Sequence, residues 1–147
     1  MQISTKMRYG SRVLSELAEA YPDGTISVRE LAEHQDISDK YLEHIMSALK
    51  SAGIVRSVRG KYGGYRLARP PADITLAEVF RVLEGTVAPV ECVERPESCS
   101  MCGACPTRGT WVEMRDAVLD VLKSTSVADL AARGREKAAS RTPMYHI

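Results

Sequence analysis

Residues 38–67, SDKYLEHIMSALKSAGIVRSVRGKYGGYRL, decide the fold of the first half of this 147-residue chain. Ser38 has a side-chain oxygen that can accept a hydrogen bond from an unpaired amide at a helix start. Gly53 can adopt the left-handed conformation that commonly follows a helix. The apolar residues between them recur with the spacing of one buried helical face: Tyr41, Leu42, Ile45, Ala48, Leu49 and Ala52. The stretch therefore predicts a helix, a strand over residues 54–58, a glycine-rich tip and a returning strand over residues 65–68.

The opposite face of this predicted helix is polar, and the hairpin after it is basic. Six basic side chains and no acidic one lie between Lys50 and Arg69. Each feature has an ordinary interpretation, because a polar face can be merely solvated and glycines can serve a turn. Their combination favours a DNA-binding helix followed by a wing. The polar face consists of Lys40, Glu43, His44, Ser47 and Ser51.

Two helical segments precede this stretch. Ser4 or Thr5 can cap a helix that runs to about residue 20. Ser27 and Glu30 have the spacing of a capping box, which predicts the start of a second, short helix. A tight connection then leads to the helix at Ser38. Two short helices joined in this way predict a helix-turn-helix.

A second group of signals follows the wing. Thr75 and Glu78 predict another capping box, opening a helix that Gly85 ends. A long helix then begins after Thr107 or Thr110 and runs to about residue 123. Its apolar stripe could pack into the chain's own domain, but a lone helix beyond a winged module favours pairing with a second copy of the chain. The stripe consists of Trp111, Met114, Val118, Val121 and Leu122.

These signals predict a mainly α-helical fold with a small β wing. We expect a winged helix-turn-helix DNA-binding domain over residues 1–85 and a cysteine-bearing segment over residues 86–109. A dimerisation helix and a short C-terminal helix, capped by Ser126, are expected over residues 110–132. Residues 133–147 read as a flexible basic tail.

Composition narrows the functional classes. The chain is 44% hydrophobic and 27% charged, as ordinary globular proteins are. It has no run of 18 apolar residues and no apolar signal core near its start, so we expect a cytoplasmic protein without membrane contact. Residues 1–69 carry 11 basic and 8 acidic side chains, whereas residues 70–122 carry 4 and 9. This asymmetry predicts that different parts of the chain have different partners.

Four cysteines lie close together in the order Cys92-x6-Cys99-x2-Cys102-x2-Cys105, with Pro106 next. In a reducing compartment, this grouping indicates metal or redox chemistry rather than structural disulfides. Thiolates select zinc, copper(I) or iron–sulfur clusters. The two short gaps followed by proline favour an iron–sulfur cluster, because zinc sites more often pair two knuckles across a longer gap. Zinc and metal-free reactive thiols remain alternatives.

With both parts in view, the chain resembles the bacterial iron–sulfur cluster regulator (IscR/NsrR-like) family of winged-helix transcription factors. The resemblance covers roughly residues 1–130. It is carried by ISTKMRYG, by ISDKYLEHIMSALKSAGIVRSVRGKYGGYRLAR, by ITLAEVFRVLEG and by the cysteine segment with Trp111. It implies a homodimer that binds partly palindromic operator DNA, with the cluster segment near the dimer interface. Some members lack the cysteines and bind a protein partner or a small molecule instead.

The resemblance also implies a ligand set. Cys92, Cys99 and Cys105 resemble the three cysteines that cluster-bearing members commonly use. Their fourth ligand is a histidine three residues after the last cysteine, or a side chain near position 8 of the partner subunit. This chain has Arg108 and Arg8 there, and neither is a credible ligand. Cys102 can supply the missing thiolate, so we expect four-cysteine ligation of a [4Fe–4S] or [2Fe–2S] cluster.

The expected DNA contacts divide by chemistry. Basic side chains would contact phosphates or the minor groove. Glu43 can accept a hydrogen bond from cytosine or exclude wrong bases. His44 and the Tyr41 hydroxyl would reach phosphates, and the resemblance implies that Ser38 faces the major groove and Arg59 the minor groove. The basic contacts are Lys40, Arg56, Arg59 and Lys61.

These features predict a homodimeric transcription regulator whose operator binding depends on cluster status, and through it on nitric oxide, redox state or iron supply. The chain has no glycine-rich nucleotide fingerprint and no Ser/His/Asp constellation, so we do not expect an enzyme. The alternatives are a winged-helix regulator with zinc or another effector, and a redox or electron-transfer protein.

Overall fold

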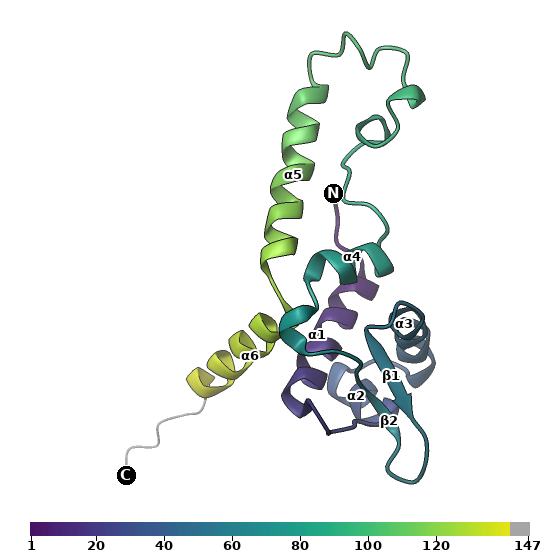
Figure 1. Ribbon diagram of the computed structural model, residues 1–147, viewed down its shortest axis with the longest axis vertical. Helices are drawn as coiled ribbons and strands as arrows, with labels where there is room; N and C mark the ends of the chain where they lie inside the picture. Colours follow the sequence, from purple (N-terminus) through teal and green to yellow (C-terminus); the bar gives the residue numbers. More distant parts are fainter. Residues whose placement is uncertain (142–147) are drawn as a thin grey trace.

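The computed structural model describes residues 1–141, so the end of the predicted basic tail lies outside the described residues. Figure 1 shows a winged-helix body from which one long helix rises. The helices are α1 (Thr5–Ala20), α2 (Val28–Gln35), α3 (Asp39–Ser51), α4 (Leu76–Leu83), α5 (Arg108–Ser124) and α6 (Val127–Arg141). The strands are β1 (Val55–Val58) and β2 (Gly64–Leu67), and the short 3₁₀ turns are η1 (Pro71–Asp73), η2 (Glu91–Val93) and η3 (Pro96–Ser98). The predicted mainly α fold with a small β wing is confirmed.

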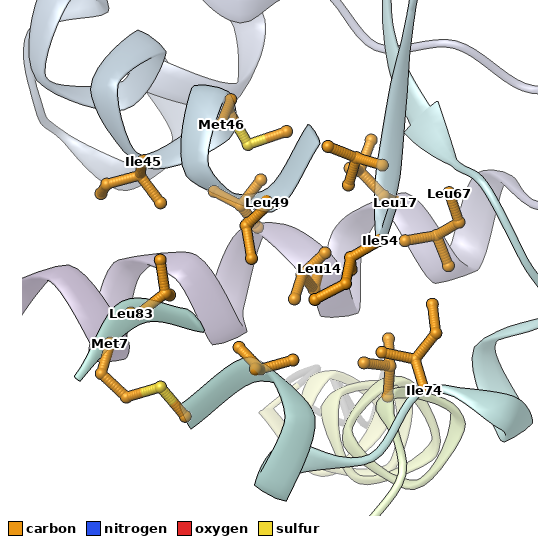
Figure 2. Close-up of a cluster of buried hydrophobic side chains, with 14 of the residues drawn as sticks. Met7, Leu14, Leu17, Ile45, Met46, Leu49, Ile54, Leu67, Ile74 and Leu83 are labelled. Atoms are coloured by element: carbon orange, nitrogen blue, oxygen red, sulfur yellow. The ribbon is translucent and has the colours of Figure 1, made fainter. Parts of the chain in front are cut away.

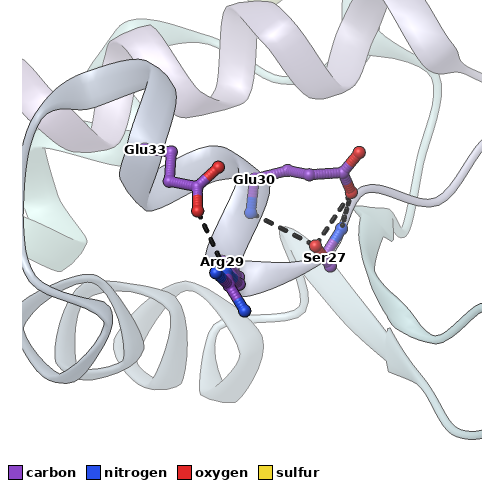
Figure 3. Close-up of polar contacts among 4 residues, drawn as sticks. All are labelled: Ser27, Arg29, Glu30 and Glu33. Carbon is purple, nitrogen blue, oxygen red and sulfur yellow. Dashed lines mark hydrogen bonds and ion pairs between the residues drawn. The ribbon is translucent and has the colours of Figure 1, made fainter.

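Three of the predicted helix starts form as expected. The side chains of Ser4 and Ser38 accept hydrogen bonds from amides three residues later, at 3.2 Å in each case. Ser27 and Glu30 form a reciprocal capping box, drawn in Figure 3. These bonds satisfy amides that have no partner inside the helix, so the sequence fixes where each helix begins.

The capping box predicted before α4 forms only in part. The Thr75 hydroxyl accepts a hydrogen bond from the Glu78 amide at 3.3 Å. The Glu78 carboxylate, however, pairs with Arg69 instead of turning back to the Thr75 amide. The prediction was wrong on this point because a stronger charged partner, nine residues earlier, competes for the carboxylate.

The hydrophobic core belongs to the winged body (Figure 2). Helix α1 runs through its middle and contacts α2, α3, α4, β2 and α6. The residues that meet there come from every element of the body, and the largest are fully buried. They include Leu14, Leu17, Leu31, Leu42, Ile45, Met46, Leu49, Ile54, Leu67 and Ile74.

The wing is a two-stranded antiparallel hairpin in which Val55 pairs with Leu67 and Val58 with Gly64. Ile26 adds an isolated bridge to Tyr65, which attaches the hairpin to the segment before α2. Gly64 has φ +156°, and a Cβ there would lie 2.2 Å from the Ile26 carbonyl oxygen. Glycine is therefore required where the wing crosses this segment.

The C-terminal part differs from the prediction. Helix α6 continues to Arg141, so the predicted short helix and flexible tail are wrong for residues 133–141. Val127 and Ala131 are buried, and α6 packs along α1. The Val127 amide also donates to the Ile74 carbonyl at 2.9 Å. Helix α6 thus completes the winged body and is not part of a separate arm.

Helix α5 is much less enclosed. None of the residues 108–124 is buried, and α5 packs against α4 of the body and against η2 of the cysteine-bearing segment. No helix in the described part of the chain is long and apolar enough to cross a membrane.

Candidate DNA-reading surface and cysteine segment

Helix α3 has a buried and an exposed face as the sequence predicts, except that Met46 joins the buried face and Ala52, predicted on that face, is exposed. Leu42, Ile45, Met46 and Leu49 are fully buried on one side. The opposite side is exposed to solvent and combines a cation, a carboxylate, an imidazole and hydroxyls, which are the groups that read base edges and phosphates. The exposed residues are Ser38, Lys40, Glu43, His44, Ser47 and Ser51.

Tyr41 occupies a different position from the other candidate contacts on α3. It is half-buried, and its ring meets Tyr9 of α1 edge-to-face at a centroid distance of 6.2 Å. Its hydroxyl lies 3.2 Å from the Thr5 hydroxyl. The ring therefore anchors the first turn of α3 to the first turns of α1, as its partial core character predicted.

The wing carries the predicted cations on its surface. Arg56 is exposed on β1, and Arg59 and Lys61 are exposed at the tip. The Lys61 ammonium lies 5.6 Å from the ring centre of Tyr62, which is 84% exposed. Sequence analysis missed Tyr62 as a candidate contact, although an aromatic ring between glycines at a basic tip was a visible signal.

Arg66 is a further residue that the sequence did not single out. It pairs with Arg56 across the hairpin, and its Nε is buried without a hydrogen-bond partner in the described structure. Two arginines directly opposite each other repel. The pair therefore concentrates positive charge at the middle of the wing, where it is available to an anionic partner.

The four cysteines are half-buried and form no disulfide with one another. The Cys102 sulfur lies 3.8 Å from the Cys92 carbonyl oxygen, which also accepts a hydrogen bond from Arg108 Nε at 3.3 Å. The Thr107 hydroxyl lies 3.4 Å from the Cys105 sulfur. That contact, helped by the Thr107 and Arg108 amides and by the Arg108 charge, lowers the pKa of the Cys105 thiol.

The donor set suits a soft metal centre, but the thiols are not assembled around one point. Four thiols in one segment match the chemistry of an iron–sulfur cluster or of zinc. Among residues 1–141, however, no three potential ligands lie close enough together to hold a metal ion. Ligation would therefore need the segment between η2 and α5 to close around the metal.

Hydrogen bonds connect the base of this segment to the DNA-reading surface. Glu84, the first residue after α4, accepts hydrogen bonds from the Ser4 amide at 3.0 Å and from the Ser4 hydroxyl. The next residue, Thr5, meets Tyr41 of α3. A short chain of contacts thus runs from the residue before Gly85 to the start of α3.

A second connection runs through Arg69, just after the wing. Its guanidinium donates to the Gly53 carbonyl at the end of α3, at 3.5 Å, and to the Asp73 carbonyl at 3.4 Å. It also pairs with Glu78 of α4. Sequence analysis missed both connections, because nothing local indicates a partner that is 80 residues away, as in the case of Ser4 and Glu84.

The chain is similar to known transcription regulators in both sequence and structure. The family model Rrf2, described as an iron-dependent transcriptional regulator, matches residues 3–133. The HTH-type transcriptional regulator CymR of Bacillus subtilis is 43% identical over 132 residues, covering 90% of this chain and 91% of the relative.

Two solved structures resemble this chain over most of its length. The structure of CymR (YrzC), titled the global cysteine regulator of B. subtilis, has 41% identity and a TM-score of 0.76, covering 90% of this chain and 98% of that one. The structure of T. potens IscR has 33% identity and a TM-score of 0.77, covering 99% and 97%. The chain therefore shares the overall fold of these transcription regulators.

Proposed function

Because the chain belongs to the Rrf2 family and is a DNA-binding transcription regulator rather than an enzyme, we propose that it is a homodimer whose operator binding is controlled by an iron–sulfur cluster. The relatives are named as transcription regulators, which argues against an electron-transfer protein. The observation that carries the proposal is the set of four free cysteines in residues 92–105 of such a chain.

Operator reading would use α3 and the wing. The exposed polar face of α3 offers Glu43 and His44 to base edges or phosphates, with Ser38 and Lys40 at its first turn. Arg59 and Lys61 at the wing tip would contact the minor groove or phosphates. The exposure of these side chains beside a fully buried opposite face supports this role, because the same helix needs one face for the core and one for DNA.

Dimerisation would use α5. Met114 is 37% exposed and Val121 is 64% exposed, and the two residues lie two helical turns apart on one face. Trp111 and Val118 belong to the same stripe and are only half-buried. Val118 and Leu122 also pack against the core of the chain itself, so the exposed part of the stripe at Met114 and Val121 is what supports pairing with α5 of a second copy.

Cys92, Cys99, Cys102 and Cys105 would hold the cluster, with zinc as the alternative metal. A bound cluster would supply reactivity toward nitric oxide and oxygen species. Its occupancy would also fall when iron is scarce. Arg108 would hold the Cys92 carbonyl and place positive charge beside the anionic thiolates. The lowered pKa of Cys105 favours its thiolate form, which is the form that binds metal.

The movement that closes the cysteine segment would be transmitted to the DNA-reading surface through α4. The segment leaves α4 at Gly85, next to Glu84, whose contacts with Ser4 lead to Thr5 and Tyr41. The start of α4 is tied through Glu78 and Arg69 to the end of α3. A small rotation of α4 would therefore move both ends of α3, and in a dimer this changes the fit to two half-sites.

Anaerobic purification tests the cofactor. We expect a brown protein with visible charge-transfer absorption and with iron and sulfide in proportion to the chain, and a colourless Cys92→Ala variant. Ser100→Ala is the matched control, because Ser100 is exposed in the same segment and should leave the colour unchanged. A colourless wild-type protein with stoichiometric zinc would assign zinc as the metal instead.

Footprinting on promoter DNA tests the control of binding. Cluster-loaded and metal-stripped wild-type protein should differ in operator affinity or in the sites they occupy, whereas Cys92→Ala should behave as the stripped form under both conditions. Identical footprints from loaded and stripped protein would remove the cluster from the regulation while leaving DNA binding intact.

A further inference from the structure

A groove of 370 Å³ lies between α1 and α6, on residues that neither DNA reading nor the cysteine segment uses. This volume is within the range of roughly 300–1,000 Å³ that small-molecule sites occupy. The lining contains three cations and two hydroxyl groups, and a Glu19 carboxylate oxygen lies at its edge beside Gly134. The polar and glycine residues of the lining are Ser11, Arg12, Ser15, Arg133, Gly134 and Lys137.

The cations of the groove form no direct ion pair in the described residues, although hydrogen bonds with Ser126 and the charge of Arg133 both lower the pKa of nearby Asp129. Arg12 is held over the Tyr9 ring at 5.7 Å, and no ion pair within residues 1–141 involves Arg12, Arg133 or Lys137. Asp129 on the same helix accepts hydrogen bonds from the Ser126 amide and hydroxyl, at 2.7 and 2.8 Å. Three like charges around one concave surface create a positive potential that attracts an anion.

Gly134 keeps the floor of the groove open. A glycine inside a helix costs about 1 kcal/mol relative to alanine, so its position in α6 needs a compensating reason. A Cβ at this position would lie 3.8 Å from the Ser15 hydroxyl and 3.9 Å from a Glu19 carboxylate oxygen. A longer side chain would therefore fill the space in front of Ser15, whose hydroxyl could otherwise donate to a ligand.

We propose that the α1–α6 groove binds a small phosphorylated molecule. A phosphate group carries a charge near −2 at neutral pH and several acceptor oxygens, which match three cations and a serine hydroxyl better than a single carboxylate does. Figure 1 shows α6 on the side of α1 away from α3 and the wing, so a free ligand fits this groove better than the operator backbone does.

Occupancy of the groove would also restrain α5. A ligand that bridges α1 and α6 fixes the position of α6 on the body. Only Thr125 and Ser126 separate α6 from α5, and Thr125 is buried with its carbonyl bonded to the Leu76 amide at 2.8 Å. A ligand in the groove would thus affect the position of α5 independently of the cysteines.

Titration of the ¹⁵N-labelled full-length protein with inorganic pyrophosphate, followed by NMR, tests the site. We expect saturable shifts at the amides of Ser15 and Gly134 and much smaller shifts with acetate at the same ionic strength. The double variant Arg133→Gln/Lys137→Gln should weaken binding by about tenfold or more, because two charge-assisted contacts are lost. Arg135→Gln is the matched control, being exposed on the same helix but outside the groove.

Two results would overturn the proposal. Equal shifts at all basic helices, unchanged in the double variant, would mean nonspecific screening rather than a site. Loss of operator affinity in the double variant with unchanged pyrophosphate binding would make the groove a DNA contact. Neither result depends on a metal, so failure here is distinguishable from failure of the cluster proposal.

Discussion

Helices α1 and α5 have almost the same length but opposite relations to the rest of the chain. Helix α1 has 16 residues, of which five are buried, and α5 has 17 residues, none of them buried. Both sequences carry an apolar stripe with helical spacing. The stripe of α1 is covered by other elements of its own chain, whereas much of the α5 stripe is exposed.

This difference separates a part of the chain that is stabilised by its own packing from a part whose position depends on a partner or a metal. The winged body can fold around α1 without outside help, because its apolar faces cover one another. The position of α5 and of the cysteine segment depends on what they meet, which we propose to be a second copy and a metal. A regulator needs this division, since a DNA-reading body must keep its shape while the part that receives the signal changes.

The largest expected effect is in the body. Leu14→Ala removes a fully buried side chain of α1 and should lower the free energy of unfolding by about 3–5 kcal/mol. Urea denaturation followed by circular dichroism measures this loss. Glu19→Gln on the exposed side of α1 should change it by less than about 0.5 kcal/mol. A similar small loss for Leu14→Ala would mean that α1 is not the centre of the core.

On α5, the corresponding change should affect assembly. Val121→Asp places a charge in the exposed apolar stripe and should raise the dimer dissociation constant by about thirtyfold or more, because burial of an unpaired charge costs at least about 2 kcal/mol. Sedimentation velocity over a range of concentrations measures this. Asp120→Asn, the neighbouring exposed residue, is the control. An unchanged dimer would remove this face of α5 from the interface.

The direct contacts with DNA should come from α3 and the wing of the body, whereas α5 should act on them only through dimerisation. Arg59→Ala at the wing tip should weaken operator binding by about 1–3 kcal/mol and reduce its salt dependence by about one phosphate contact. Fluorescence anisotropy at several salt concentrations measures both quantities. Arg81→Ala, an exposed cation on α4, should leave both unchanged. Equal losses in the two variants would indicate only a general electrostatic effect.

Loss of the contact between Glu84 and Ser4 should have a smaller effect on the free energy of unfolding. It tests whether the cysteine segment is coupled to the DNA-reading surface. Glu84→Gln should lower the free energy of unfolding by about 1 kcal/mol. It should also reduce the difference in operator affinity between cluster-loaded and stripped protein. Glu91→Gln, whose partner Arg95 is exposed, is the control. A full remaining difference in Glu84→Gln would exclude this route between the two regions.

The smallest expected effect is on the pH dependence of the free energy of unfolding, through the His34–Glu16 pair on the surface of the body. The hydrogen bond to Glu16 raises the pKa of His34 above its ordinary value of 6.5. The pair therefore stabilises the fold fully below pH 6.5, and this contribution is lost as pH rises through the folded-state pKa. Unfolding measured from pH 5.5 to 8 should show this small decline, and both His34→Gln and Glu16→Gln should remove it. A decline that persists in both variants would have another origin.

The sequence predicted the helix caps and helix faces well, because these depend on residues close together in the chain. The caps at Ser4, Ser27 and Ser38 join residues three apart, and the faces of α3 follow from helical spacing alone. The end of α6 was predicted wrongly because residues 133–147 were interpreted from their basic charge as a flexible tail. Alanine, arginine, glutamate and lysine nevertheless favour helix strongly, and packing against α1 supplies the rest.

The sequence by itself determined the helix starts, the wing, the polar face of α3 and the cysteine donor set, because each depends on neighbours along the chain. The tertiary structure alone decided that Glu84 meets Ser4, that Glu78 pairs with Arg69, and that α6 closes a basic groove on α1. A periodic pattern shows that a face needs covering. Which element covers it depends on the packing of all the others, and that choice is made only when the whole chain folds.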